Sequence, residues 1–327
     1  MSETKSYEPN ELNITTSNPK RIIVIAGGSN HERDISLRSG NRVANILKTL
    51  GHIVKIVDLN EETIDEINSF TPDLVWSLVH GELGEDGSLQ DLLETLQYPY
   101  VGSNAQGCRM ASSKPIAKSK IMEIGLTTPE FISLPQRAFK NFGATKVLKA
   151  IAGKLGYPLV IKPSAGGSAL GVSFANDDLS LRESMIEAFV YGRHVLIEKA
   201  VKGKELAVSI VEFDGKPIAL PIVEISTREG DYDFDARYIA ERTEYFTPAR
   251  ITDNQAEKVK DFAVKVHETL GLKDLSRIDV ILDKEENIWF LDANVTPGMT
   301  DTSLLPQAAQ AYSSFEEIIE HIAQIER

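Results

Sequence analysis

Two apolar runs late in the chain, SRIDVIL at 276–282 and IWFLDAN at 288–294, predict a β-hairpin closed by the turn DKEEN at 283–287. Each run carries two charged or amide residues that are two positions apart. Successive side chains of a strand point to opposite faces, so the polar residues of one run share a face. Pairing of the two strands then brings all of them to one side of the hairpin. The polar residues are Arg277, Asp279, Asp292 and Asn294.

This polar cluster predicts a magnesium site. Two carboxylates and one amide oxygen form a hard, oxygen-only donor set, which suits Mg²⁺ bound beside phosphate groups. Asp279, Asp292 and Asn294 are therefore the candidate metal ligands, and Arg277 is a cation that can hold a developing oxyanion. The alternative is a solvated hairpin face with scattered charges. The strongly apolar residues around the acids favour the buried cluster over that alternative.

A second candidate is the glycine-rich loop 164–171, SAGGSALG, which follows a predicted strand at 157–162. Glycines let backbone N–H groups approach phosphate oxygens, and Lys162 just before the loop supplies a point charge. The loop does not match the Walker A pattern, and Gly27-Gly28 does not match the GxGxxG pattern of dinucleotide folds. A loop of this kind is more often a simple turn, so its interpretation depends on Lys162 and on the downstream cluster.

Two further motifs stand at predicted strand ends, where the functional loops of an α/β sheet lie. The sequence HGELGEDG at 80–87 combines three glycines with three acids and a histidine. It suits a loop that contacts a substrate, and it suits a surface loop equally well. Glu198-Lys199 ends a predicted strand at 194–199, so its backbone can face a flat base, while an exposed ion pair is at least as good an interpretation.

The order of elements predicts an α/β protein with an α+β arrangement in its C-terminal half. Strands are predicted at 21–26, 52–57 and 73–79 and a helix at 36–50, and this alternation favours a parallel sheet. A later helix at 254–270 precedes the hairpin. We expect a flexible N-terminal arm at 1–20, an α/β unit at 21–103, a central unit at 104–200 and a C-terminal unit at 201–327.

Composition limits the classes of partner. The chain has 327 residues, and its net charge of −13 repels phosphate backbones and anionic lipids, so we expect neither nucleic acid nor membranes as partners. The N-terminus lacks the pattern of a signal peptide, and no apolar run is long enough to span a bilayer. The lone cysteine, Cys108, excludes an intrachain disulfide and is best interpreted as a small buried residue. We therefore expect a cytoplasmic protein.

Eight segments, in this order, resemble the D-alanine–D-alanine ligases of the ATP-grasp superfamily. The likeness spans roughly residue 21 to the C-terminus, and the ordered set is far more specific than any single segment. It implies an ATP-grasp fold with an N-terminal parallel α/β domain and a lid loop at 226–248. The segments are GGSNHERDISL, HGELGEDGSLQ, SSKPIAKSK, YPLVIKPSAGGSALGVS, VLIEK, YDFDARY, RIDV and LDANVTPGMTDTSLLP.

The resemblance also implies an activity. It implies that ATP, held between two sheets, phosphorylates one D-alanine and that a second D-alanine attacks the acyl phosphate, giving D-alanyl-D-alanine for peptidoglycan precursors. It implies two Mg²⁺ or Mn²⁺ ions and a homodimer.

The residues that resemble the family's nucleotide site lie mostly in the middle of the chain. Asp279, Asp292 and Asn294 resemble its metal ligands, which agrees with the interpretation of the hairpin. The residues that resemble ATP ligands are Lys114, Lys162, Ser168, Glu198, Lys199, Val201 and Glu205.

The residues that resemble the family's substrate and catalytic groups come from both ends of the chain. Arg277 and the backbone N–H of Gly298 resemble an oxyanion hole, and Glu32, Ser168 and Tyr238 resemble a hydrogen-bonded trio. The residues that resemble substrate contacts are Glu32, His80, Arg237, Ser303 and Leu304.

Four positions depart from the family pattern, and they bear on rate and substrate choice more than on fold. Asp292 stands where Glu is usual, Ala169 replaces a serine, Gly166 stands where an acid is common, and Arg237 replaces a frequent Lys. One alternative is a ligase for another amino-acid or hydroxy-acid pair, although Tyr238 favours an amine nucleophile. Another is a catalytically impaired nucleotide-binding homologue. A Rossmann dehydrogenase leaves the hairpin cluster unexplained.

Overall fold

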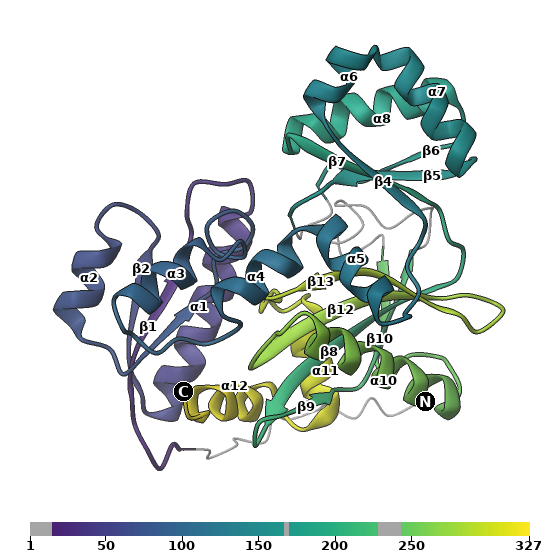
Figure 1. Ribbon diagram of the computed structural model, residues 1–327. Coiled ribbons are helices and arrows are strands. Elements are labelled where there is room, and N and C mark those ends of the chain that lie inside the picture. Colours follow the sequence, from purple (N-terminus) through teal and green to yellow (C-terminus); the bar gives the residue numbers. More distant parts are fainter. Residues whose placement is uncertain (1–14, 167–169, 228–242) are drawn as a thin grey trace, which may run out of the picture.

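The computed structural model describes residues 15–166, 170–227 and 243–327, and these residues form three sheets flanked by helices (Figure 1). The first sheet is parallel, in the order β2-β1-β3. Its strands are β1 (Arg21–Ala26), β2 (Ile53–Asp58) and β3 (Leu74–Ser77), and its helices are α1 (Arg33–Leu50), α2 (Thr63–Phe70) and α3 (Ser88–Thr95).

Strand β1 is the centre of this sheet, and the predicted parallel arrangement is confirmed. Its apolar side chains alternate between two cores, with Ile22 and Val24 in one and Ile23 and Ile25 in the other. Helix α1 begins at Arg33, three residues before the predicted start. The first turn has a single apolar residue, Ile35, so its apolar period is not recognisable, while Asp34 in that turn interacts favourably with the helix dipole.

The second sheet is antiparallel, in the order β4-β7-β5-β6, and three helices pack on one side of it (Figure 1). On β5, Leu159 and Ile161 point into the core beneath those helices, whereas Val160 and Lys162 line a cavity on the opposite face. The strands are β4 (Phe131–Pro135), β5 (Leu159–Pro163), β6 (Ser173–Ala175) and β7 (His194–Lys199); the helices are α6 (Gln136–Phe142), α7 (Ala144–Leu155) and α8 (Asp178–Tyr191).

The third sheet has the order β11-β10-β8-β12-β13, with β9 paired to β8. The predicted hairpin is confirmed: β12 and β13 are antiparallel neighbours. Residues 226–227 and 243–246 of the predicted lid loop belong to strands β10 and β11. Residues 228–242 of that loop lie outside the described part of the chain. The strands are β8 (Lys204–Phe213), β9 (Lys216–Ala219), β10 (Val223–Thr227), β11 (Thr243–Phe246), β12 (Leu275–Leu282) and β13 (Ile288–Asn294).

Helices join the three sheets. Helix α5 lies between the second sheet and β13 (Figure 1). Its Lys118 ammonium donates to the carbonyl of Phe290 on β13 at 3.2 Å. Helix α12 packs beside α1, and the Lys20 ammonium just before β1 donates to the Ala323 carbonyl at 2.7 Å. These helices are α4 (Ala105–Ser112), α5 (Lys114–Glu123), α10 (Asp253–Thr269), α11 (Leu304–Tyr312) and α12 (Phe315–Gln324).

The first and third sheets share one apolar core, whereas the second sheet has its own. Leu47 and Trp76 of the first unit belong to the same buried cluster as Phe315 and Ile319 of the last helix. The core of the second sheet consists of residues between 132 and 197, all of them from that unit. The second sheet is therefore joined to the rest of the molecule mainly through its connections and the polar contacts around the cavity.

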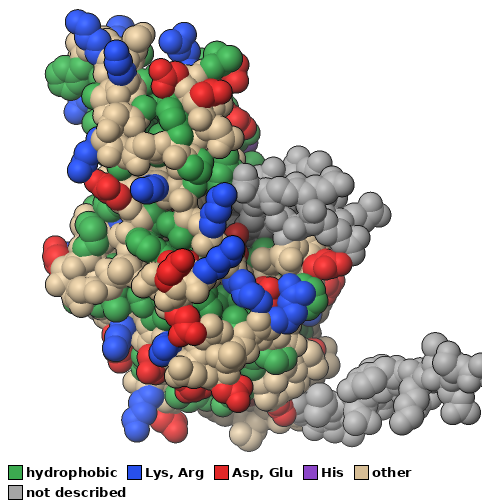
Figure 2. Space-filling model, turned by 90° about the vertical axis from the view of Figure 1, so that its right-hand side faces the viewer, with side chains coloured by type: hydrophobic (Ala, Val, Ile, Leu, Met, Phe, Trp, Pro, Cys, Tyr) green, Lys and Arg blue, Asp and Glu red, His purple; other side chains and the backbone are tan. Residues whose placement is uncertain are grey.

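Charge is unevenly distributed over the surface. Figure 2 shows acidic and basic side chains intermixed over one face, with several Lys and Arg side chains at its upper end. Helices α6 and α7 contain five basic residues and no acidic one, so the net charge of −13 does not describe every face. Across the part of the chain that the structure describes, no helix combines the length and apolar character needed to cross a membrane.

Candidate active site

A cavity of about 910 Å³ lies between the three sheets, and most of the sequence-predicted nucleotide residues line it. The first sheet contributes the loops that carry Glu32 and Glu85, and the second and third sheets form facing walls. The predicted nucleotide and metal residues that line it are Lys114, Lys162, Glu198, Lys199, Val201, Glu205, Asp279 and Asp292.

Part of the cavity is an apolar slot between the two walls. Val160 and Phe174 are cross-strand neighbours on the second sheet, and Ile281 and Leu291 line the cavity from the third. The pairing of β12 with β13 skips Leu291: Asp279 pairs with Asp292, whereas the next residue, Val280, pairs with Phe290. This bulge lets both Leu291 and Asp292 line the cavity. A flat slot with apolar walls suits a planar aromatic base.

The second sheet contributes positive charge beside this slot. The Lys162 ammonium lies 2.6 Å from Glu198 Oε1, and the Lys118 ammonium lies 2.8 Å from Glu198 Oε2. Burial acts to raise the pKa of the Glu198 carboxyl, but the two lysines outweigh burial and hold that pKa below its usual value. Glu198 is therefore a carboxylate at neutral pH and is shared by two cations.

Lys114 connects the glycine-rich loop with the hairpin. Its ammonium donates to the Gly166 carbonyl at 2.6 Å and to Asp292 Oδ2 at 2.7 Å, and its backbone N–H donates to the Ser164 carbonyl. A lysine in this place lies between the loop proposed to hold phosphate and a candidate metal ligand. The two sequence signals that seemed separate along the chain are thus parts of one site.

The candidate metal ligands come together as the hairpin predicts. Arg277 pairs across the strands with Asn294, and Asp279 pairs with Asp292. Arg277 donates to both oxygens of Asp279, at 2.7 and 2.8 Å. Asn294 Oδ1 accepts from the Thr296 backbone N–H at 2.8 Å, which leaves a second lone pair on that oxygen.

The donor set fits a hard divalent cation. Among the described residues, no group of three or more His, Cys, Asp and Glu side chains is placed to hold a metal. A site at the hairpin therefore needs the Asn294 amide oxygen beside the carboxylates of Asp279 and Asp292, and such an all-oxygen set with space for phosphate oxygens suits Mg²⁺ or Mn²⁺. Asn294 itself does not line the cavity.

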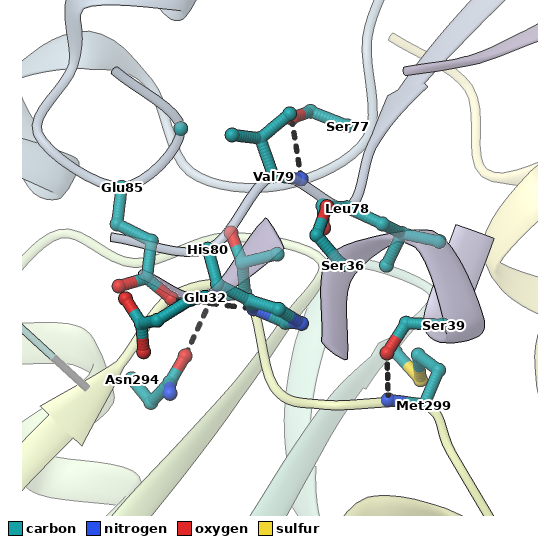
Figure 3. Close-up of polar contacts among 12 residues, drawn as sticks. Glu32, Ser36, Ser39, Ser77, Leu78, Val79, His80, Glu85, Asn294 and Met299 are labelled. Carbon is teal, nitrogen blue, oxygen red and sulfur yellow. Dashed lines mark hydrogen bonds and ion pairs between the residues drawn. The ribbon is translucent and has the colours of Figure 1, made fainter. Parts of the chain in front are cut away.

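The loops of the first sheet place Glu32, His80 and Glu85 near one another (Figure 3). Asn30 holds this arrangement, because its amide donates to the His80 carbonyl at 2.6 Å and accepts from the Glu32 backbone N–H at 2.9 Å. Gly81 has a φ of +71°, and a Cβ there would lie 2.3 Å from Glu32 Oε2. Only glycine leaves room for the Glu32 carboxylate.

His80 is buried behind the cavity wall. Its Nδ1 lies 3.7 Å from Glu85 Oε1, and its Nε2 has no hydrogen-bond partner among the described residues. Figure 3 shows its ring between Glu32 and the start of α1, in the region that also contains Asn294. A buried ring nitrogen of this kind is suited to a polar ligand group.

The other predicted residues that the structure describes do not line the cavity. Gly298 is in close contact with Ser303, because a Cβ on Gly298 would lie 2.7 Å from the Ser303 hydroxyl. That hydroxyl accepts from the Thr300 backbone N–H at 3.0 Å. Leu304 is buried in the shared core, and Arg277 is also buried. Ser168, Arg237 and Tyr238 lie outside the described residues.

Sequence reasoning missed Lys118 and gave Glu85 no individual role. Lys118 follows Lys114 by four residues, so the two lysines share a face of α5, and this spacing was a usable signal. The pattern cannot show which distant sheet that face meets. Cys108 is buried as predicted, and burial raises the pKa of its thiol to about 12, so it is not a nucleophile at neutral pH.

Facing sheets with lysines on one wall and paired carboxylates on the other define the class of an ATP-grasp enzyme, an ATP-dependent carboxylate–amine ligase. Two solved structures support this fold. The D-alanine–D-alanine ligase of Bacillus anthracis superimposes with a TM-score of 0.80 and 31% identity, covering 93% of this chain and 96% of that one. Its complex with ATP gives a TM-score of 0.76 at 28% identity, with the same coverage.

The family follows from the sequence matches. The model described as D-ala D-ala ligase C-terminus matches residues 121–324, and the one described as D-ala D-ala ligase N-terminus matches 60–103. A D-alanine–D-alanine ligase of Pelotomaculum thermopropionicum is 34% identical over 306 residues, covering 93% of this chain and 96% of the relative. The chain belongs to the D-alanine–D-alanine ligase family.

Proposed function

We propose that this enzyme joins two D-alanine molecules to D-alanyl-D-alanine at the expense of ATP, as a precursor for peptidoglycan. The observation that carries the proposal is the β12–β13 register, which places Asp279 opposite Asp292 on the wall that faces Lys162. This arrangement offers carboxylates for a metal and cations for phosphate on opposite sides of one cavity.

ATP is proposed to lie along the interface between the two sheets. Its base enters the slot between Val160 and Leu291, and the backbone of Glu198 to Val201 faces the edge of the base. The triphosphate extends toward Lys114, Lys162 and the glycine-rich loop, where ammonium groups and backbone N–H groups offset its charge. Asp279, Asp292 and Asn294 would hold two Mg²⁺ or Mn²⁺ ions, whose positive charge would offset that of the phosphate oxygens.

The first chemical step activates one D-alanine. We propose that Glu32, which lines the cavity, holds the ammonium of this substrate and that His80, which is buried behind the cavity wall, donates to its carboxylate. An oxygen of that carboxylate attacks the γ-phosphorus of ATP, and the bond from phosphorus to the ADP oxygen breaks. The products of the step are ADP and an acyl phosphate.

The second step forms the peptide bond. The neutral amine of a second D-alanine, proposed to be held at Ser303 and Leu304, attacks the acyl carbon, and the carbonyl oxygen becomes an oxyanion. Arg277 and the Gly298 N–H stabilise this oxyanion. The tetrahedral species then breaks its carbon–oxygen bond to release phosphate, and the nitrogen loses a proton to solvent.

The enzyme is further proposed to act in the cytoplasm as a homodimer. The single cysteine, reduced and buried, is compatible with a reducing compartment. Light scattering after gel filtration measures the oligomeric state directly, and a mass of one chain would contradict the dimer.

The deciding experiment measures phosphate release from ATP with single amino acids and pairs. We expect release only when D-alanine is present, with D-alanyl-D-alanine detected by mass spectrometry, and background release with L-alanine or with no amino acid. A preference for D-lactate or D-serine as second substrate would support a ligase for another pair. An absence of release with every pair, despite ATP binding, would support a nucleotide-binding homologue.

A further inference from the structure

Lys118 is a fully buried lysine that belongs to none of the proposed ATP contacts. Its ammonium lies 2.8 Å from Glu198 Oε2 and donates to the Thr128 hydroxyl at 2.7 Å and the Phe290 carbonyl at 3.2 Å. The contact with Glu198 is an ion pair and the other two are hydrogen bonds, so three oxygens surround the ammonium. The ring centroids of Phe131 and Phe290 lie 5.9 and 5.8 Å away, so both sheets enclose the charge.

Burying an ammonium group costs free energy of desolvation, so we expect a neighbouring group whose own charge requires a cation beside it. Burial lowers the pKa of Lys118 to about 8, which shows the cost of keeping the ammonium charged. An apolar side chain would pack in the same volume without that cost. The partner that requires a charge is Glu198, because the two neutral oxygens at Thr128 and Phe290 do not.

The two lysines beside Glu198 differ in what else they reach. Lys162 lines the cavity, whereas Lys118 is sealed behind the wall with no exposed side-chain surface. Each lysine occupies one oxygen of the carboxylate. The three groups together carry one net positive charge, and only Lys162 can present it to a ligand.

We infer that Lys118 is a positioning residue for ATP: it balances the charge of Glu198, so that Lys162 keeps its own positive charge for the phosphates. Without Lys118, Glu198 and Lys162 form a neutral pair, and Lys162 then offers phosphate no net positive charge. The inference rests on the proposed binding of ATP, but it does not depend on which amino acids are joined.

The test compares ATP with adenosine, which fills the base slot but carries no phosphate. Calorimetry on the full chain with Mg²⁺ gives the Kd of each ligand for the wild type, Lys118→Met and the control Lys120→Met. Lys120 lies on the same helix and is exposed in an ion pair with Glu123. For Lys118→Met we expect the Kd of ATP to rise at least about tenfold, while that of adenosine stays within about threefold. Lys120→Met should match the wild type for both ligands.

A second variant separates charge balance from simple structural support. Lys118→Met combined with Glu198→Gln removes both charges of the pair and leaves Lys162 positive, so ATP affinity should recover to within about threefold of the wild type. This double variant carries the test if Lys118→Met alone does not fold. Equal weakening of ATP and adenosine, or a double variant that still binds ATP tenfold more weakly, would overturn the inference alone. A wild-type chain that binds no ATP would overturn the proposed function as well.

Discussion

On the second sheet one carboxylate, Glu198, is shared by Lys118 and Lys162, whereas on the third sheet Asp279 and Asp292 each have a cation of their own. The first wall therefore has an excess of positive charge, and the second wall is balanced pair by pair. A triphosphate is bound by cations that are not already paired with a carboxylate. A carboxylate that is paired with one side-chain cation can exchange that cation for a metal ion. The difference supports the proposal that phosphate binds at the first wall and the metal at the second.

The largest expected effect comes from removing a carboxylate from the balanced wall. Asp279→Asn keeps the shape and one acceptor for Arg277 but removes the charge. We expect turnover to fall on the order of 10³-fold, or about 4 kcal/mol of transition-state stabilisation, because phosphoryl transfer loses a metal ligand. Phosphate release at saturating ATP and D-alanine measures it.

The matched control for that variant is Glu257→Gln, an exposed carboxylate on α10 that pairs with Lys260. It should leave turnover unchanged, since exposed pairs of this kind contribute little. If Asp279→Asn retained more than a tenth of wild-type turnover, Asp279 would have to be removed from the metal site.

An intermediate effect is expected where the two walls meet. Lys114→Met removes the ammonium that contacts both the Gly166 carbonyl and Asp292. We expect the KM for ATP to rise roughly 10- to 100-fold, which corresponds to one charged hydrogen-bonding group. Steady-state kinetics with varied ATP measures it, and an unchanged KM would show that Lys114 has no part in binding the nucleotide.

The smallest effect on activity is expected away from both walls. Because burial raises the pKa of the Cys108 thiol to about 12, the thiolate fraction at pH 8 is roughly 10⁻⁴. Native protein should therefore react with iodoacetamide at least about 10²-fold more slowly than protein unfolded in urea. Cys108→Ala should keep its kcat. Rapid labelling of native protein with loss of activity would contradict both the burial of Cys108 and its interpretation as a small buried residue without a catalytic role.

The comparison of the walls also explains what could be predicted from sequence. The hairpin carries its information locally: apolar residues alternate with Arg277 and Asp279 on one strand and with Asn294 on the other, so the pairing was predictable. Strand boundaries at 21–26, 194–199 and 288–294 match the structure because each run is bounded by turn or charged residues.

The features that could not be predicted depend on contacts between distant segments. The bulge at Leu291 changes which side chains line the cavity, and strict strand alternation does not reveal it. The sharing of Glu198 by Lys118 requires α5 to pack between two sheets that are far apart along the chain. The roles assigned by resemblance to His80, Gly298 and Ser303 remain predictions.

The shared core of the first and third sheets has a consequence for synthesis on the ribosome. Leu47 and Trp76 are made long before Phe315 and Ile319, which belong to the apolar layer that covers them. A nascent chain therefore carries an incompletely covered apolar sheet until helix α12 emerges, while the second sheet can complete its own core earlier. The first sheet is thus translated before the second but completed after it, and termination before α12 leaves an exposed apolar surface that chaperones or proteases can bind.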